Sequence, residues 1–278
     1  MTVWFITGAS RGFGLEIAKE ALSRGDSVVA TARNPQAVLD AIGDVDDRLL
    51  AVGLDVSAPE QAQAAVDAAI QRFGRIDVLV NNAGRGLVGA VEETSDAEAR
   101  AIFDVNVFGL LAVTRGVLPH MRAARSGLVV NISSVGGFVA WPGWGVYAAT
   151  KFAVEALSEA MTHELAPLGI KSVAIEPGPF RTNFLDGSSL SVVKSQLDDY
   201  AATAGAARTW ATDTNYDQDG DPVKAAKIIV DLAGYDDLPE RIQLGGNAVA
   251  DVAAKIERTH NDQVQWRSIS LSADYAKS

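Results

Sequence analysis

Residues 7–22 read "TGASRGFGLEIAKEAL", and this stretch decides the fold. It follows the short apolar run "VWFIT" (3–7) and continues into apolar residues at helical spacing. Gly8 permits a tight turn after a strand, Gly12 lets backbone N–H groups approach an anion, and Gly14 lets the helix pack closely. A helix that starts here directs its positive dipole end at that anion. The order of strand, glycine loop and helix therefore predicts a diphosphate-binding loop, with a plain turn as the alternative.

Five further apolar runs recur along the chain and alternate with segments of helical spacing. They are "SVVATA" (27–32), "RLLAVGLDV" (48–56), "DVLVNN" (77–82), "GLVVNIS" (127–133) and "KSVAIEPG" (171–178). Strands that are apolar throughout and alternate with helices form a parallel sheet covered on both faces. Gly25, Gly74 and Gly169 each follow a helical segment and suit helix ends. The pattern predicts an α/β fold, a doubly wound parallel sheet (Rossmann fold), as a single domain over 1–278.

Residues 183–221 interrupt this rhythm. The segment is polar, rich in small residues and without period, as in "SSLSVVKSQLDDY". A long irregular segment inside a compact fold is more often a functional lid than a plain connection. We therefore expect an irregular substrate lid here, and this stretch is called the lid segment below.

Composition narrows the class of protein. The chain has 278 residues, of which 48% are apolar and 21% charged, and its net charge is −11. This acidic balance argues against a nucleic-acid surface. The chain has no cysteine, and its three histidines are widely separated, so a metal site is not expected. It has no run of eighteen apolar residues and no basic n-region at the N-terminus, so we expect a cytoplasmic protein with no membrane partner.

Tyr147 and Lys151, in "VYAATKF", lie four positions apart and share one face of a helix. A phenol has a pKa near 10 and exchanges protons poorly at neutral pH. A lysine ammonium close by favours the phenolate, so Lys151 is expected to lower the pKa of Tyr147. The pair is then an acid and base tuned for proton transfer, although a helix that merely carries both residues is the alternative.

Further motifs give the sequence its resemblance to a known family. Besides the glycine loop there are "NNAG" (81–84), "DVNVFG" around Asn106, "NISS" (131–134) ahead of the Tyr-x-x-x-Lys pair, and "PGPFRT" (177–182). In this order and spacing they resemble the short-chain dehydrogenase/reductase family over essentially the whole chain. The tail, "RIQLGGNAVADV", is similar to hydroxysteroid/retinol-dehydrogenase-like and carbonyl-reductase-like members.

The resemblance implies hydride transfer between a nicotinamide cofactor and a carbonyl or alcohol. It makes Tyr147 the proton donor or acceptor, with Lys151 also holding the nicotinamide ribose. Ser134 is expected to hydrogen-bond and polarise the substrate oxygen. Asn106 is expected to hold a water that extends a proton relay, although an asparagine within a helix can simply satisfy backbone groups.

The resemblance also implies a set of cofactor-binding residues, spread over the loops that follow the strands. They are Gly8, Ser10, Arg11, Gly12, Phe13, Gly14, Arg33, Asp55, Val56, Asn82, Ala83, Gly84, Tyr147, Lys151, Pro177, Gly178 and Thr182. Asp55 is expected to accept a hydrogen bond from the adenine amino group, although it could instead cap the next helix.

The second strand indicates which nicotinamide is bound. A chain specific for NAD usually places an acidic residue at the end of this strand, whereas here it ends in Ala32 and Arg33. Arg33 and Arg11 could meet a 2′-phosphate as guanidinium forks. The cofactor is therefore expected to be NADP(H).

The substrate is expected to be a medium-sized, largely apolar carbonyl compound or alcohol. Trp141, Trp144 and Phe180 supply apolar area close to Ser134 and Tyr147, although the tryptophans could equally pack the loop. Members of the family commonly pair through helices equivalent to 94–123 and 147–166, which implies a homodimer or homotetramer.

Two other functions stay open. An epimerase or dehydratase of the extended branch also uses Tyr-x-x-x-Lys, but that branch tends to carry G-x-x-G-x-x-G and a larger C-terminal domain. A catalytically silent NADP-sensing regulator would keep the fold without the chemistry, and the intact Ser134, Tyr147 and Lys151 count against it.

Overall fold

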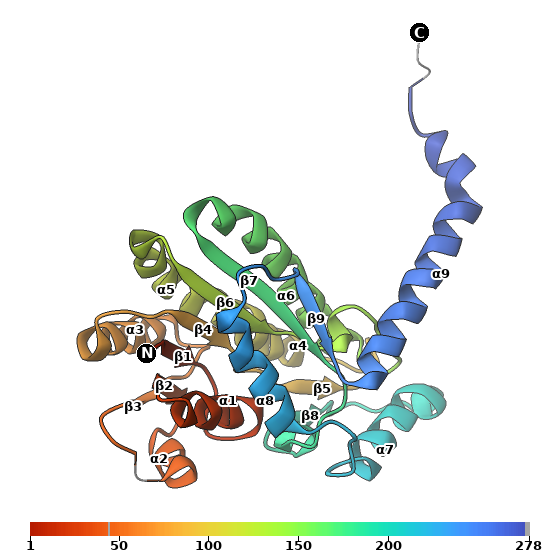
Figure 1. The fold of residues 1–278 in the computed structure, drawn as a ribbon. Coiled ribbons are helices and arrows are strands. Elements are labelled where there is room, and N and C mark those ends of the chain that lie inside the picture. Colours follow the sequence, from red (N-terminus) through yellow and green to blue (C-terminus); the bar gives the residue numbers. More distant parts are fainter. Residues whose placement is uncertain (44, 276–278) are drawn as a thin grey trace.

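The computed structural model describes residues 1–43 and 45–275, which build a seven-stranded parallel sheet between layers of helices (Figure 1). The strand order is β3-β2-β1-β4-β6-β7-β9. The strands are β1 (Val3–Ile6), β2 (Ser27–Ala32), β3 (Leu49–Gly53), β4 (Val78–Asn81), β6 (Gly127–Ile132), β7 (Ile170–Pro177) and β9 (Arg241–Leu244). The order reverses between β1 and β4, and ligands of such sheets bind at the carboxyl ends of the strands at that point.

All six apolar runs of the sequence form strands of this sheet, so the predicted fold class is confirmed. The seventh strand, β9, was not predicted. It pairs with β7 alone, from Arg241 opposite Ala174 to Leu244 opposite Pro177. Because β9 lies at the sheet edge and alternates polar with apolar residues, it lacks the continuous apolar signature of a central strand.

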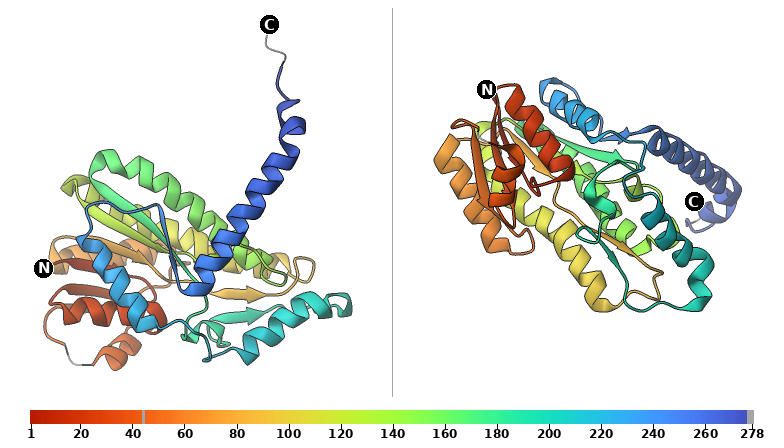
Figure 2. Two further views of the ribbon diagram at one scale, coloured as in Figure 1. Left: turned by 45° about the vertical axis from the view of Figure 1, so that its right-hand side comes forward. Right: turned by 90° about the horizontal axis from the view of Figure 1, so that it is seen from below.

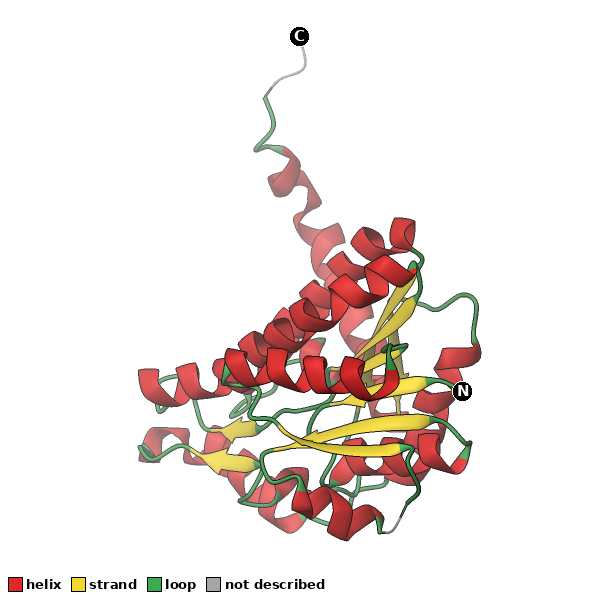
Figure 3. Cartoon of the chain, turned by 90° about the vertical axis from the view of Figure 1, so that its left-hand side faces the viewer, coloured by secondary structure: helices red, strands yellow, loops and turns green. Residues whose placement is uncertain are grey.

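The helices cover both faces of the sheet, as Figures 2 and 3 show from two further sides. The α-helices of the described residues are α1 (Gly12–Ser23), α2 (Gln36–Ile42), α3 (Pro59–Phe73), α4 (Asp96–Phe103), α5 (Leu110–Ala124), α6 (Gly145–Leu165), α7 (Ala206–Asp213), which lies in the lid segment, α8 (Pro222–Asp231) and α9 (Gly246–Leu271), most of which points away from the sheet. One core packs α1 and α8 on the sheet, around Ile17 and Ile229. The second packs α3, α5 and α6 on the opposite face, around Val66, Val117 and Met161.

The helix ends follow the sequence signals. Gly74 after α3 and Gly169 after α6 have φ of 74° and 73°, the left-handed conformation that glycine adopts without a Cβ clash. Gly25 also has a positive φ and directly follows Arg24, the C-cap residue of α1.

The helical run Asp96–Ala124 is long enough to cross a membrane and contains an apolar window of 18 residues with a mean hydropathy of 1.6. Here α4 continues through a π-helical turn (Asp104–Gly109) into α5. Its apolar side chains Ile102, Val113 and Val117 are buried in the domain. Core packing therefore accounts for the hydropathy of this run.

The lid segment is more regular than its sequence indicates. It contains β8 (Leu190–Val192), which pairs in parallel with β5 (Gly86–Val88), and a helical run, Ala201–Asp213, that begins with a π-helical turn and ends in α7. The expectation of an irregular segment was therefore wrong for these residues. These elements are held by contacts with residues that are distant in the sequence, and local periodicity cannot reveal such contacts.

Glu93 supplies the main anchor of the lid segment. Its buried carboxylate accepts hydrogen bonds from Arg208 Nη1 of α7 at 2.8 Å and from Leu197 N at 2.9 Å. Ala90 N donates to the same carboxylate at 2.8 Å. These three donors hold the pKa of Glu93 at about 2, well below its usual range.

Candidate active site

One cavity of ≈ 1170 Å³ lies at the carboxyl ends of the strands, between the glycine loop and the lid segment. Every predicted site residue borders it except Gly14 and Asn106. Those at its wall are Gly8, Ser10, Arg11, Gly12, Phe13, Arg33, Asp55, Val56, Asn82, Ala83, Gly84, Ser134, Trp141, Trp144, Tyr147, Lys151, Pro177, Gly178, Phe180 and Thr182. The topology thus brings together residues from six separate stretches of sequence.

The glycine loop is held against the loop after β4. Asn82 Nδ2 donates to the backbone oxygens of Thr7 and Gly8, at 2.8 and 3.0 Å. A β-carbon at position 14 would lie 2.5 Å from Gly8 O and 2.5 Å from Asn82 Nδ2, so only glycine fits there. Gly14 therefore acts from behind the cavity wall, by letting α1 pack closely on the loop.

The first turn of α1 offers its backbone N–H groups to an anion. Arg11 is the N-cap residue and makes no side-chain cap, and the first turn carries no acidic residue. The first amides of a helix have no partner within the helix. Together with the helix dipole they fit the diphosphate of a nicotinamide dinucleotide.

The end of the cavity that is expected to hold the adenosine lies between β2 and β3. Arg33 and Asp55 both border the cavity there. Asp55 Oδ1 accepts from Ser57 N at 3.0 Å and from Ser57 Oγ at 2.6 Å. The Ser57 hydroxyl chiefly, and also the Arg33 charge, lower the pKa of Asp55. The N-cap of α3 is Ala58, so Asp55 closes the turn before the helix and does not cap it.

Arg11 is turned toward the lid segment. Its Nη1 donates to Ser188 Oγ at 2.8 Å and its Nη2 to Ser188 O at 3.0 Å. The predicted contact with a 2′-phosphate therefore requires Arg11 to leave Ser188. Of the two predicted arginines, Arg33 is the one whose guanidinium has no such partner within the described residues.

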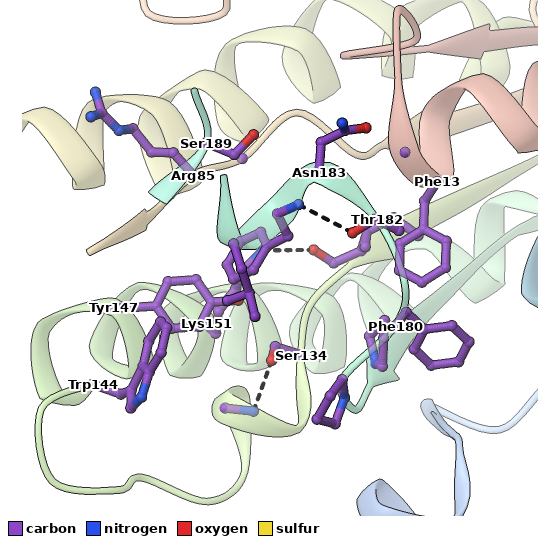
Figure 4. A pocket seen from close by; sticks show the side chains of 18 of the residues that line it. Phe13, Arg85, Ser134, Trp144, Tyr147, Lys151, Phe180, Thr182, Asn183 and Ser189 are labelled. Carbon is purple, nitrogen blue, oxygen red and sulfur yellow. Dashed lines mark hydrogen bonds between the residues drawn. The ribbon is translucent and has the colours of Figure 1, made fainter. Parts of the chain in front are cut away.

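Tyr147 projects from the first turn of α6 and is buried. Burial raises the pKa of its phenol to about 12, while a hydrogen bond with the Ser134 hydroxyl acts in the opposite direction. The sequence-based expectation that Lys151 lowers this pKa is not met, because desolvation outweighs every other influence. Ser134 Oγ also accepts from Gly136 N at 3.0 Å, which fixes the hydroxyl at the end of the strand (Figure 4).

Lys151 lies one turn after Tyr147 and is likewise buried. Its Nζ donates to the backbone oxygen of Ile132 at 2.8 Å. Burial lowers the pKa of Lys151 to about 8, and the Glu155 carboxylate acts in the opposite direction. The ammonium still has donors to offer to a ligand in the cavity, since it carries three.

Asn106 lies behind this pair, in the π-helical turn between α4 and α5. Its Nδ2 donates to Arg85 O at 2.9 Å and to Thr150 Oγ1 at 3.0 Å, and its Oδ1 accepts from Arg85 N at 2.9 Å. The side chain therefore ties the loop after β4 to α6. This is the backbone-satisfying role weighed from the sequence, and a bound water at Asn106 stays a prediction.

A pair of buried carboxyl groups lies behind Lys151, and the sequence reasoning did not identify it. Glu155 follows Lys151 by one turn of α6, and Glu176 lies at the end of β7. Burial chiefly raises the pKa of Glu155 to about 7, and the Glu176 charge adds to this. Arg241 stands 4.0 Å from Glu155 and lowers that pKa in part.

Aromatic side chains surround the phenol. The Trp144 and Tyr147 rings are 5.8 Å apart in an edge-on arrangement, and the Phe184 ring lies 5.6 Å from Tyr147. Trp210 of α7 packs edge-on against Trp144 at 6.2 Å. Trp144 was predicted to line the substrate site. Phe184 was missed, because it lies in the lid segment just beyond "PGPFRT", where no periodicity marks it.

Phe180 and Trp141 occupy other parts of the wall. Phe180 packs on Phe13 with ring centroids 5.1 Å apart, on the side of the glycine loop (Figure 4). Trp141 is 37% exposed at the mouth of the cavity. The residues nearest to Tyr147 are therefore Trp144 and Phe184, and Phe180 lies beside the cofactor loop.

The residues that the structure describes contain no group of three or more histidine, aspartate or glutamate side chains arranged to hold a metal ion. The cavity instead brings together the Tyr147 phenol, the Ser134 hydroxyl and the Lys151 ammonium with the glycine loop.

The model of a protein family described as "short chain dehydrogenase" matches residues 2–191. Oxidoreductase BOA17 of Botryotinia fuckeliana is 36% identical over 272 residues, which cover 98% of either chain. The 3-ketodihydrosphingosine reductase of Bacteroides thetaiotaomicron is 42% identical over 196 residues, or 70% of either chain.

Solved structures agree with these matches. A short-chain dehydrogenase from Streptomyces avermitilis is 40% identical with a TM-score of 0.92, covering 99% of this chain and 100% of that one. A 3-ketoacyl-(acyl-carrier-protein) reductase from Brucella melitensis complexed with NADH is 27% identical (TM-score 0.74, 89% and 98% covered). ElxO with NADP bound is 26% identical (TM-score 0.74, 90% and 99% covered). Similar structures thus hold either nicotinamide dinucleotide.

Proposed function

The chain belongs to the short-chain dehydrogenase/reductase family, and from the geometry of its site we propose that it interconverts a carbonyl and a secondary alcohol with NADP(H). The cofactor, when bound, supplies or accepts the hydride. The diphosphate would rest on the first turn of α1, with Ser10, Gly12 and Phe13 around it. The adenosine would lie by Asp55, Val56 and Asn82–Gly84, and the nicotinamide end by Pro177, Gly178 and Thr182.

Tyr147 handles the proton of the reaction. With its pKa raised to about 12, the phenol is protonated at neutral pH and can donate to the oxygen of a carbonyl that is being reduced. Ser134 is fixed by Gly136 N and can donate its own proton to the same oxygen. Two donors aimed at one oxygen stabilise the negative charge that develops there.

Lys151 places a positive charge behind the phenol. Its bond to Ile132 O fixes the ammonium at the base of the cavity, where it can hold ribose hydroxyls. A cation there also stabilises the phenolate that remains after proton donation, by the Coulomb attraction of opposite charges at short range. The lysine therefore supports both binding and proton transfer.

The observation that carries the proposal is the meeting of Ser134, Tyr147 and Lys151 in the same cavity as the glycine loop. The test is a panel of ketones, aldehydes and secondary alcohols, followed by the change in NADPH absorbance. We expect turnover of at least one ketone or aldehyde class. Tight NADPH binding with no turnover across the panel would favour the NADP-sensing regulator.

Arg33 supports NADP(H) over NAD(H). It stands at the end of β2 beside the adenosine end of the cavity, where no carboxylate is available for a ribose 2′-hydroxyl. A hydrogen bond to a charged group contributes ~1.5–3 kcal/mol. Since Arg11 is engaged with Ser188, one such contact predicts a preference of ~10–10² for NADPH. Arg33→Asp should reverse it, and equal efficiency with both cofactors at low salt would refute the assignment.

The substrate is proposed to be largely apolar. Trp144 and Phe184 pack on Tyr147, Trp210 packs on Trp144, and all three line the cavity, as apolar rings do in most small-molecule sites. Two of the similar proteins are named as reductases of a 3-keto compound, which supports a ketone and the reductive direction. The lid segment would close over the bound substrate.

We also propose a cytoplasmic homodimer or homotetramer. Phe108, before α5, is 56% exposed and Phe152 of α6 is 43% exposed, on the two helices through which the family pairs. Exposed aromatic rings on neighbouring helices are typical of an interface.

A further inference from the structure

Gln218, in the lid segment, carries a polar side chain that is buried without a partner. The residue is 3% exposed and borders the active-site cavity. Its Oε1 accepts no hydrogen bond from any of the residues that the structure describes. An unpaired buried acceptor costs free energy, because the oxygen has lost its contact with water and has gained no donor in return. Such a group at the wall of a cavity calls for a donor from the ligand that the cavity holds.

Hydrogen bonds of the backbone fix the place of Gln218. Residues 218–220 run alongside 179–181, the stretch that follows β7. Arg181 Nε donates to Gln218 O at 3.2 Å, and Arg181 N donates to Gly220 O at 2.9 Å. Phe180 covers Gly220 so closely that a β-carbon at position 220 would overlap the ring. Gln218 is therefore tied to the loop after β7, although it belongs to the lid segment.

The loop after β7 is the part of the wall that we propose for the nicotinamide end of the cofactor. Its Phe180 ring packs on Phe13 of the glycine loop, with ring centroids 5.1 Å apart (Figure 4). Thr182 also lies against the glycine loop, since a β-carbon on Gly12 would be 3.7 Å from Thr182 Cβ. Gln218 thus borders the cavity from the same loop that carries Thr182.

The chemistry of Oε1 selects the ligand group that it can bind. A glutamine oxygen only accepts hydrogen bonds, so its partner must be a donor. The phosphates of the cofactor and a substrate carbonyl also only accept, so neither suits it. The adenine amino group and the ribose hydroxyls do donate, but the residues proposed to meet them include Asp55, after β3, and Lys151, on α6. The donor that is left at this end of the cofactor is the carboxamide NH₂ of the nicotinamide.

We propose that Gln218 binds the carboxamide of the nicotinamide, with Oε1 accepting from its N–H. The inference rests on the proposed function, since it takes a nicotinamide dinucleotide as the ligand. Two primary amides can also pair through two hydrogen bonds, because each offers a donor and an acceptor. Gln218 is then a cofactor-binding residue of the lid segment, and through it the lid segment takes part in holding the cofactor.

Gln218→Leu tests this contact by binding alone, without turnover. Leucine fills most of the side-chain volume and removes the amide. Fluorescence titration should show an NADPH dissociation constant raised about 10-fold, as expected for the loss of one hydrogen bond. Gln218→Met, a second apolar variant, should give the same rise. Gln196→Leu is the matched control, since Gln196 is exposed in the same segment, outside the cavity wall, and should leave the constant unchanged.

Two ligands related to NADPH locate the contact. The reduced 3-acetylpyridine analogue carries a methyl ketone in place of the carboxamide and so lacks its N–H donors. 2′-Phospho-ADP-ribose lacks the whole nicotinamide. Gln218→Leu should leave the dissociation constants of both ligands unchanged. A loss of affinity for 2′-phospho-ADP-ribose equal to that for NADPH would place Gln218 at the phosphates and overturn the proposal.

The melting temperature separates a binding role from a structural one. Gln218→Leu removes a buried oxygen that has no partner, so the ligand-free variant should melt at or above the temperature of the wild-type chain. The rise on adding NADPH should be smaller for the variant, because stabilisation by a ligand follows its affinity. A variant that melts lower without ligand but binds NADPH normally would show that Gln218 is structural, which contradicts the proposal.

The failure of this inference differs from the failure of the proposed function. If wild-type chain and Gln218→Leu bind NADPH equally well, the inference alone is wrong. If the wild-type chain binds no nicotinamide dinucleotide, the proposed function is wrong and the inference falls with it.

Discussion

Lys151 of α6 donates a hydrogen bond from Nζ to the backbone oxygen of Ile132, at the end of β6, at 2.8 Å. This contact crosses from helix to sheet directly beneath the cavity. It holds the buried Lys151 ammonium in one position, one helical turn from the Tyr147 phenol. A lysine side chain on the surface would be free to move. The position of the charge is thus set by the fold before any ligand binds.

Lys151→Ala should weaken both turnover and NADPH binding. The variant loses the charge proposed to stabilise the phenolate and the donors proposed to hold the ribose, so we expect a fall in kcat of ~10²–10⁴ and a rise in the NADPH dissociation constant. Steady-state kinetics and fluorescence titration separate the two effects. A purely catalytic defect with unchanged NADPH affinity would contradict the ribose role.

The pH dependence should differ between the two directions. Since burial raises the pKa of Tyr147 to about 12, the phenol is protonated across the physiological range. Reduction needs that proton, so its kcat/KM should change little with pH between 6 and 8. Oxidation needs the phenolate, so its kcat/KM should rise about tenfold per pH unit up to about pH 8 and level off above it, because Lys151, whose pKa burial lowers to about 8, then loses the charge that stabilises the phenolate. Oxidation that is independent of pH between 6 and 8 would speak against Tyr147 as the base.

Glu155 should make the folded state less stable at high pH. Its pKa is raised from 4.5 in the unfolded chain to about 7 in the folded protein. The folded state therefore binds more protons between these values, and stability falls as pH rises from about 4.5 to about 7. Glu155→Gln should remove this loss and raise the melting temperature at pH 8 by a few degrees, corresponding to ~1–3 kcal/mol.

Thermal melts at pH 5 and pH 8 measure the effect of Glu155. Glu159→Gln is the control, since Glu159 lies one turn further along α6, is 52% exposed and pairs with the same Arg241. If the two variants respond equally to pH, the buried carboxyl is not the cause.

The lid segment should loosen when Glu93 loses its charge. Glu93→Gln weakens the bonds to Arg208 Nη1 and Leu197 N, so limited proteolysis within 194–221 should become faster. Asp96→Asn removes an exposed ion pair with Arg100 nearby and should leave the cleavage rate unchanged. NADPH with a ketone should slow cleavage in the wild-type chain. Equal rates in all these samples would argue that this segment does not act as a lid.

The features that were predicted from the sequence are those marked by local patterns, namely continuous apolar runs and the order of short motifs. Six strands and the glycine loop follow from continuous apolar runs and from the order strand, loop, helix. Ser134, Tyr147 and Lys151 follow from motif order, because parallel strands end at one edge of the sheet and bring these loops together.

What the sequence did not predict depends on contacts between distant residues. The pKa of Tyr147 is set by burial, which includes side chains from the lid segment such as Phe184. Arg11 donates a hydrogen bond to Ser188, which lies 177 positions away in the sequence. The helix at 201–213 depends on the anchor at Glu93, and no local pattern connects these stretches.

The most direct test of the account is the rate at which Tyr147→Phe oxidises NADPH with a ketone that the wild-type chain reduces. Phenylalanine keeps the ring between Trp144 and Phe184 and removes only the hydroxyl that carries the proton. The account predicts a rate lower by ~10²–10⁴ with the NADPH dissociation constant nearly unchanged. A variant that reduces the ketone at the wild-type rate would contradict it.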